Sequence, residues 1–390
     1  MIKFDHVTKR YPGSAGAAVD DLDLEIPDGQ TMVLVGPSGC GKTTSLRMIN
    51  RMVDPTQGRI LLDGRDIRQV DPARLRRGIG YVIQHAGLFP HRTIEDNIAT
   101  VPLLIGWGRQ KARQRARELM DLVSLDPAMA RRYPHQLSGG QQQRVGVARA
   151  LAADPPVLLM DEPFSAVDPI VRATLQDELL RIQERLHKTV VLVTHDVEEA
   201  IKVGDRVAVF RPGGTIAQVD APSHLLGSPA DDYVADFLGF DRGIRRLSFF
   251  SASTLDLETD SVVSDRTTAG EARTVAKESG QPWLLVVDPQ RLPSGWIPAA
   301  VLEELPASVT LAQAPLANSG HTFRIASDSL RAALDATVLS PTSRAVAVDD
   351  SGRVLGVTSY DRLRAAIHSS TLADDTDAVT RPSAQGGPTR

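Results

Sequence analysis

Short apolar runs alternate with helical patterns along the first part of the chain. The runs Thr31–Val35, Val157–Met160 and Val190–Val193 are continuous and rich in β-branched residues, as is typical of buried parallel strands. Residues 42–50 and Pro169–His187 follow two of these runs and have helical patterns. The alternation predicts a largely parallel sheet wrapped by helices, an α/β fold.

A mainly helical insert interrupts this alternation. It runs from about Thr93 to Leu151 and contains an amphipathic helix pattern over Arg109–Val123. We expect the insert to form a helical subdomain within the first domain, residues 1–240.

The hydrophobic pattern changes after Gly239. Residues 241–248 (DRGIRRLS) form a basic connector, and a smaller α/β pattern follows to about His368. Within it, residues 283–305 parallel residues 344–366, so the region contains a weak internal repeat. Such a unit buries its apolar faces by pairing with its twin, which predicts a second domain over 249–368.

Each copy of the repeat is preceded by a helical pattern, at Thr267–Glu278 and at Asp328–Ala336. Residues 369–390 are rich in Ser, Thr, Asp, Gly and Pro, and we expect them to form a disordered tail.

Composition and charge exclude several classes of protein. The 390 residues are 42% apolar and 24% charged, which is typical of a globular protein with more than one domain. The net charge of −4 and the aromatic content of 4% argue against a nucleic-acid partner. The single cysteine, Cys40, allows no intrachain disulfide and fits a reducing cytoplasm. No run approaches the roughly 18 apolar residues that span a bilayer, and the first residues lack a signal core, so we expect a membrane link only through a partner.

The loop GPSGCGKT, Gly36–Thr43, fits the G-x-x-x-x-G-K-[ST] pattern and lies between an expected strand and helix. In such a loop, backbone N–H groups turn inward around phosphates and the helix N-terminus favours negative charge. Lys42 would neutralise the β- and γ-phosphates, and the Thr43 hydroxyl would ligate Mg²⁺. We interpret Cys40 as a small loop filler because no base partner for a nucleophile is evident.

The segment VLLMDEP, Val157–Pro163, supplies a second part of such a site. Asp161 ends the apolar run and can hold Mg²⁺ through water, and Glu162 can orient or deprotonate the attacking water. An acidic pair after a strand is often only a solvated loop. The phosphate loop upstream favours the catalytic interpretation here.

The segment LSGGQQQR, Leu137–Arg144, is the most specific of the three motifs. Its glycine pair could be a simple helix start, but it lies upstream of the Asp-Glu pair as a second phosphate-binding element. With all three motifs in order, residues 1–240 resemble the ATP-binding-cassette (ABC) ATPases. The resemblance implies a P-loop NTPase fold with a RecA-like core and a helical subdomain. It also implies a head-to-tail dimer in which ATP bound to one subunit is covered by four residues of the other, Ser138, Gly139, Gly140 and Gln141.

The resemblance assigns further roles by position. It implies that Tyr11 stacks on adenine, although a core tyrosine at a strand end is the alternative. It implies that Gln84 touches Mg²⁺ and the attacking water, that His195 contacts the γ-phosphate, and that Asp168 lies in a loop joining the two subunits. The cofactors would be ATP and Mg²⁺. The residues implied for ATP are Tyr11, Gly36, Pro37, Ser38, Gly39, Cys40, Gly41, Lys42, Thr43 and Thr44, and those implied for the metal are Thr43, Gln84 and Asp161.

Among ABC proteins, an importer subunit fits best. The chain lacks the membrane spans of fused exporters, a long coiled coil inside the cassette, and a second cassette. Residues 46–64 and 79–104 resemble importers of glycine betaine, choline, carnitine or proline. The C-terminal repeat resembles a degenerate pair of CBS modules, which would be regulatory.

The resemblance implies several partners: a second cassette, usually in a homodimer, integral membrane permease subunits and, indirectly, an extracytoplasmic solute-binding protein. The chain would then lie at the cytoplasmic face of the cell membrane. Two alternatives stay open, an importer ATPase for another small solute and a soluble non-transport ABC ATPase with a regulatory CBS pair.

Overall fold

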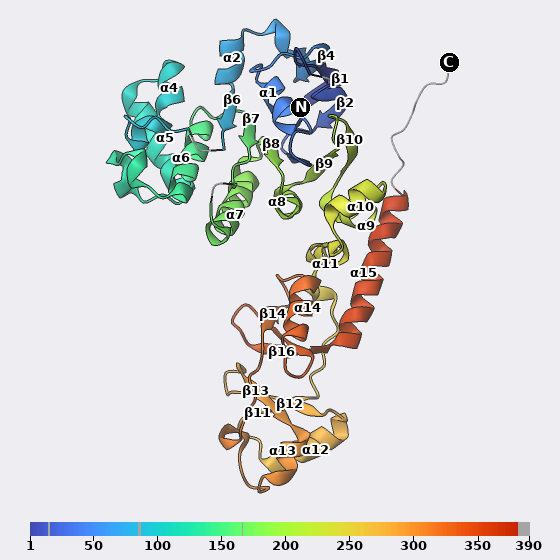
Figure 1. The fold of residues 1–390 in the computed structure, drawn as a ribbon. Helices are drawn as coiled ribbons and strands as arrows, with labels where there is room; N and C mark the ends of the chain where they lie inside the picture. The colour runs from blue at the N-terminus through green and yellow to red at the C-terminus, as the bar shows by residue number, and fades with distance from the viewer. Residues whose placement is uncertain (15, 85–86, 166, 381–390) are drawn as a thin grey trace. The chain divides into compact units, whose positions relative to one another are not determined.

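The computed structural model describes residues 1–14, 16–84, 87–165 and 167–380 (Figure 1). The chain divides into two compact units, Met1–Phe240 and Asp241–Arg390. Each unit has hydrophobic clusters of its own. Within the described residues, no helix combines the length and the apolar character needed to cross a bilayer.

A six-stranded sheet forms the centre of the first unit. Five neighbouring strands are parallel, and one edge strand, β10, is antiparallel. The expected strands are present as β3, β7 and β8, and every residue of these three strands is buried, which explains their continuous apolar sequence. The order across the sheet is β10 (Ile216–Asp220), β9 (Arg206–Phe210), β3 (Thr31–Val35), β8 (Thr189–Thr194), β7 (Val157–Asp161) and β6 (Ile79–Val82).

A smaller antiparallel sheet shares a core with one face of this sheet and with helix α1 (Lys42–Ile49). Its strand order is β2 (Val19–Ile26), β1 (Ile2–Lys9), β4 (Gln57–Leu62) and β5 (Arg65–Asp66).

The remaining helices of the first unit fall into two groups. The helical insert contains α3 (Ile94–Ile98), α4 (Thr100–Leu104), α5 (Arg109–Leu122) and α6 (Gly139–Leu151) (Figure 1). Its apolar side chains join the second large cluster of the unit. The other helices are α2 (Pro72–Arg77), α7 (Pro169–Leu186), α8 (Val197–Val203), α9 (Pro222–Gly227) and α10 (Asp232–Leu238).

The second unit contains two three-stranded sheets with the same topology. In each, the central strand is parallel to the first strand and antiparallel to the third. The antiparallel register shifts between the last two residues of the central strand. The first strand of each copy, β11 or β14, was not expected from the sequence because it has only three residues. The strands are β11 (Val262–Ser264), β12 (Trp283–Val287), β13 (Pro293–Pro298), β14 (Thr322–Arg324), β15 (Arg344–Val348) and β16 (Val354–Ser359), and the helices are α11 (Arg242–Arg246), α12 (Ala269–Ser279), α13 (Ala299–Glu304), α14 (Leu330–Val338) and α15 (Tyr360–Thr380).

The segment that precedes each copy of the repeat pairs with the last strand of the other copy. Glu258, ahead of the first copy, forms a bridge with Val357 of β16, and Ala317, ahead of the second, forms one with Trp296 of β13. A glycine adjoins each bridge. A Cβ at Gly295 would lie 2.4 Å from the Ala317 carbonyl oxygen, and one at Gly356 would lie 2.8 Å from that of Glu258. Glycine is therefore required for both close approaches.

The expectation of a disordered tail from residue 369 is wrong for its first part. Helix α15 continues to Thr380, because the segment contains no helix breaker before Pro382. Residues 381–390 lie outside the described residues.

Candidate nucleotide-binding site

The glycine-rich loop joins the end of β3 to the start of α1. Three of its glycines have positive φ angles, 154° at Gly36, 79° at Gly39 and 98° at Gly41, which is the N-cap of α1. A Cβ at Gly41 would lie 2.2 Å from the Ala18 carbonyl oxygen, and one at Gly36 would lie 2.7 Å from that of Phe210. The backbone can follow this path only with glycine at these two positions.

The Lys42 ammonium lies over this loop. Its Nζ donates hydrogen bonds to the carbonyl oxygens of Gly36 (2.7 Å) and Pro37 (2.8 Å), and the residue is only 6% exposed. Burial raises the pKa of the Cys40 thiol, so it stays protonated near neutral pH. This agrees with the interpretation of Cys40 as a loop filler.

Two candidate metal ligands meet beside the loop. The Thr43 hydroxyl donates to the Asp161 carboxylate at 2.9 Å, although the residues come from different elements, α1 and β7. Arg47 lies 3.6 Å from the same carboxylate, and the Tyr81 hydroxyl donates to it at 3.4 Å. A hydroxyl and a carboxylate side by side fit Mg²⁺, which prefers oxygen ligands and keeps several waters.

The three expected catalytic side chains meet, because Gln84 and His195 both lie against the Glu162 carboxylate. The Gln84 amide donates to it at 3.2 Å, and His195 Nδ1 lies 3.4 Å from its other oxygen. Gln84 follows β6, Glu162 follows β7 and His195 follows β8, so the residues meet at the carboxyl edge of adjacent parallel strands. The residues after Gln84, 85–86, lie outside the described residues.

The backbone at Glu162 holds this carboxylate in place. Its φ of 46° is in the left-handed region, which costs a non-glycine residue about 1 kcal/mol or more. The Glu162 N–H donates to the Val193 carbonyl at 3.0 Å, and the Ser165 hydroxyl donates to the Glu162 carbonyl at 2.9 Å. These bonds fix the strained turn and aim the side chain toward Gln84 and His195.

The segment Ser138–Gln141 lies apart from this convergence. Ser138 caps α6 in a capping box: its hydroxyl accepts from Gln141 N at 3.3 Å, and the Gln141 amide oxygen accepts from Ser138 N at 3.0 Å. In Figure 1, α6 lies with the helical insert, away from α1 and the adjoining loop. In the described part of the first unit, no hydrogen bond or ion pair joins this segment to the loop or to Glu162.

Asp168 and Tyr11 occupy two further positions. Asp168 caps α7 by accepting from the N–H groups of Ile170 (3.0 Å) and Val171 (3.1 Å). Tyr11 follows β1 and is 42% exposed, with Lys9 Nζ 5.2 Å from its ring centroid. This exposure does not fit the alternative of a core tyrosine.

A buried polar cluster next to His195 was not predicted from the sequence. Glu199 of α8 accepts a 2.6 Å hydrogen bond from the Thr194 hydroxyl, and burial raises the pKa of its carboxyl. Arg172 of α7 lies within ion-pair distance of Glu199 and of Asp196. The sequence does contain a signal for this cluster, because three carboxylates, Asp196, Glu198 and Glu199, lie within four residues after His195.

Comparison with known proteins extends this description. A family model described as ABC transporter matches residues 19–165. The osmoprotectant import ATP-binding protein OsmV of Salmonella typhimurium is 45% identical over 369 residues, covering 93% of this chain and 94% of that protein. The chain belongs to the ABC transporter family.

Two further proteins support membership of this family. The choline transport ATP-binding protein OpuBA of Bacillus subtilis is 39% identical over 387 residues, covering 96% of this chain and 98% of that protein. A dimeric ATP-binding cassette solved with ADP and Pi matches with a TM-score of 0.52 and 33% identity, covering 57% of this chain and 99% of that one. The expected cassette fold and ABC-type ATPase are thereby confirmed.

Proposed function

We propose that this chain is the ATP-hydrolysing subunit of an importer for glycine betaine or a related osmoprotectant. The convergence of Gln84, Glu162 and His195 beside the glycine-rich loop carries the hydrolytic part of the proposal. Relatives named for osmoprotectant and choline transport, matching over nearly their whole length, support the transport part.

The geometry gives each side chain a task in hydrolysis. The carbonyls of Gly36 and Pro37 hold the Lys42 ammonium over the loop, where it can neutralise phosphate charge. Thr43 and Asp161 would hold Mg²⁺, which supplies further neutralisation when bound. Glu162 accepts a proton from the attacking water, while Gln84 and His195 orient its carboxylate.

A dimer is part of this proposal. Ser138–Gln141 lies apart from the loop of its own chain, so its helix N-terminus is left to bind the ATP of a partner cassette. The similar cassette solved as a dimer with ADP and Pi supports this arrangement.

The permease would dock in a cleft of about 230 Å³ behind α1, lined by Asn50, Met52, Arg76, Arg77 and Arg149 among others. Met52 is 52% exposed. Exposed apolar surface beside arginines fits a permease segment that carries apolar and acidic residues.

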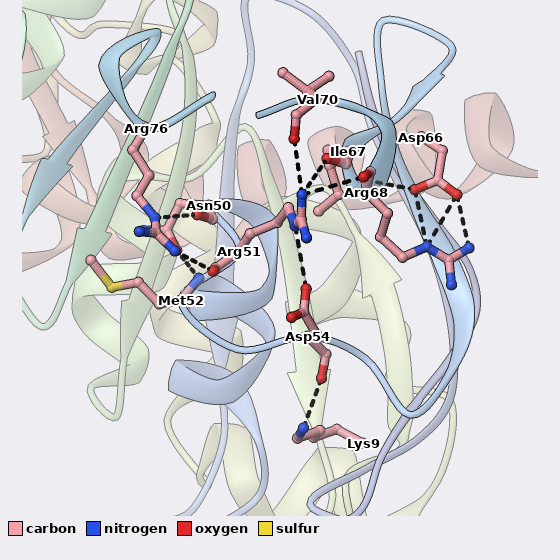
Figure 2. A network of polar contacts seen from close by, with 10 residues as sticks. All are labelled: Lys9, Asn50, Arg51, Met52, Asp54, Asp66, Ile67, Arg68, Val70 and Arg76. Atoms are coloured by element: carbon pink, nitrogen blue, oxygen red, sulfur yellow. Dashed lines mark hydrogen bonds and ion pairs between the residues drawn. The ribbon is translucent and has the colours of Figure 1, made fainter. Parts of the chain in front are cut away.

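Two arginines form a polar network with backbone groups next to this cleft, and Figure 2 shows their contacts. Arg76 donates to the carbonyls of Asn50 (3.1 Å) and Arg51 (2.5 Å). The Arg51 guanidinium in turn donates to the Val70 carbonyl at 2.9 Å and pairs with Asp54. Because this network continues directly from α1, movement at the glycine-rich loop would reach the permease. The chain would thus lie at the cytoplasmic face of the membrane, held there by the permease.

Within the second unit, residues 249–368 would form a degenerate tandem CBS-like regulatory domain. Its two copies with equal topology and equal register shifts support this assignment.

The substitution Glu162→Gln tests the hydrolytic proposal. It should leave ATP binding intact, abolish phosphate release and trap a nucleotide-bound dimer, since the amide cannot accept the proton. Phosphate release and size-exclusion chromatography measure both outcomes, with the exposed Glu184→Gln on α7 as control. Hydrolysis by Glu162→Gln at a near-normal rate would contradict the assignment. Uptake of labelled betaine against choline and proline, in cells with and without this chain, tests the solute.

A further inference from the structure

Arg172 lies one turn into α7, directly behind the segment expected to join two subunits. Its backbone N–H donates to the Asp168 carbonyl at 2.9 Å, within the first turn of the helix. Its guanidinium also reaches back to the Val167 carbonyl, with Nη2 at 3.5 Å. Arg172 is therefore hydrogen-bonded to both residues of the 167–168 segment, to one through its backbone N–H and to the other through its guanidinium.

The same guanidinium faces α8, which begins directly after His195. Its Nη1 lies 3.4 Å from Asp196, and its Nε lies 3.7 Å from Glu199. Asp196 is the N-cap of α8 and accepts from the Glu198 N–H at 2.8 Å. The position of Arg172 is thus linked to the turn that carries His195.

Both neighbours of His195 belong to this cluster. The Thr194 hydroxyl donates to Glu199 at 2.6 Å and accepts from the Asp196 N–H at 3.0 Å. The Glu199 side chain is only 5% exposed, and a buried carboxylate is stable only when it is paired or hydrogen-bonded. Arg172 is a cation within ion-pair distance of this carboxylate.

The contacts of Arg172 are long for charged groups. Charge-assisted hydrogen bonds are about 2.7–2.9 Å, whereas the hydrogen bond of Arg172 to Asp196 is 3.4 Å and its ion pair with Glu199 is 3.7 Å. The buried Nε has no hydrogen-bond acceptor within reach among the described residues. A small movement of α7 toward α8 would shorten the hydrogen bond to Asp196 and bring Nε within hydrogen-bond distance of Glu199.

We infer that Arg172 is a positioning residue that links the subunit-joining segment Val167–Asp168 to His195. A partner cassette that displaces this segment changes the contacts of Arg172 with Asp196 and Glu199. Those contacts set where His195 lies against Glu162. The inference rests on the proposed function, since it assumes hydrolysis by a dimer.

Steady-state hydrolysis by the full-length chain tests this role. Arg172→Ala should lower kcat by about 10- to 100-fold, as expected for a misplaced catalytic group, with little change in KM. Arg172→Lys should fall between it and wild type, because a single ammonium cannot serve two carboxylates as a guanidinium does. Arg181→Ala is the matched control, since among the described residues Arg181 on α7 bonds only the Asp177 carbonyl of its own helix.

Dimer trapping separates positioning from assembly and folding. In the Glu162→Gln background, Arg172→Ala should still form the ATP-bound dimer at the ATP concentration that Glu162→Gln alone requires. Wild-type kcat in Arg172→Ala would overturn the inference, as would equal losses of turnover and trapping. If Arg172→Ala does not fold, Asp196→Asn gives the answer, because the amide oxygen keeps the cap of α8 while the charge facing Arg172 is lost. It should lower kcat with trapping intact, and an unchanged kcat would refute the link.

Wild-type and Glu162→Gln assays run in parallel keep the two proposals apart. A wild-type chain without ATPase activity contradicts the proposed function. Equal activity of wild type and Arg172→Ala contradicts only the role of Arg172.

Discussion

The glycine-rich loop and the Ser138–Gln141 segment use their polar groups in opposite ways. Around the loop, side chains from separate elements bond to one another, as Thr43 does with Asp161 and Gln84 does with Glu162. In the second segment, the described side-chain bonds of Ser138 and Gln141 stay within their own helical turn. The first region is assembled by the fold of one chain, whereas the second is a self-contained helix start that can be presented to another molecule. In the proposed dimer, each cassette would therefore carry two half-sites, each completed by the partner cassette.

The difference also separates the effects of mutation. Around the loop, a substitution should act on ATP binding or chemistry within one chain. At Ser138–Gln141, it should act on association with a partner and leave binding to the chain's own loop intact. Three substitutions test this separation, in decreasing order of expected effect.

The largest effect is expected for Gly41→Ala. The new Cβ would lie 2.2 Å from the Ala18 carbonyl oxygen at a φ of 98°, so the loop cannot keep its path. ATP affinity should fall by at least about 100-fold, because backbone that cradles the phosphates is displaced. Gly39→Ala is the matched control: its Cβ meets nothing within 4 Å, and only the strain of its φ, about 1–2 kcal/mol, remains. Titration with a fluorescent ATP analogue measures both. Equal losses would show that loop strain, and not the close approach, is limiting.

How much of this arrangement the sequence predicts depends on the range of each interaction. The loop, β3, β7 and β8 follow from local patterns, since a buried parallel strand is apolar at every position. The meeting of Gln84, Glu162 and His195 follows less directly, because it needs the strand order β8-β7-β6. The roles of Gln84 and His195 came from the family resemblance, and no strand order was predicted from the residues themselves.

Interactions between distant residues were not predictable in this way. The local sequence does not indicate that Arg172 and Glu199 are partners, because each has the pattern of an ordinary charged residue on an amphipathic helix. The segments that pair between the two copies of the second unit are similar: Gly295 and Gly356 look like turn or bulge glycines until the opposing carbonyls are known. Helix α15 was mistaken for part of a disordered tail because composition was averaged over 369–390, although its prolines and glycines lie only after residue 381.

An intermediate effect is expected for Ser138→Ala. The loss of the cap costs the start of α6 about 1 kcal/mol, and the partner's nucleotide loses a hydroxyl hydrogen bond to a charged group, about 1.5–3 kcal/mol. In the Glu162→Gln background, the ATP concentration needed for dimer formation should therefore rise at least about tenfold. The ATP affinity of the monomer should stay unchanged. Light scattering and analogue titration measure the two quantities.

Thr93→Ala is the matched control for this prediction. Thr93 caps α3 by accepting from the Asp96 N–H at 3.2 Å, so its loss also removes an N-cap within the helical insert. It should leave dimer formation unchanged. A Ser138→Ala chain that dimerises as readily as Thr93→Ala would refute the sharing of the site between subunits.

The smallest effect is expected for Tyr11, which belongs to the half-site of its own chain. Its ring is exposed and follows β1, and Lys9 Nζ lies 5.2 Å from the ring centroid. Stacking of a base on an aromatic ring contributes about 1–3 kcal/mol, and the lower value applies to a ring that stays exposed on one side. Tyr11→Ala should thus weaken ATP binding about fivefold, whereas Tyr11→Phe keeps the stacking face and should bind as wild type does. Because a stacked adenine distinguishes ATP from bare triphosphate, inorganic triphosphate should bind wild type and Tyr11→Ala equally. A fivefold loss for triphosphate as well would mean that Tyr11 shapes the loop instead of contacting the base.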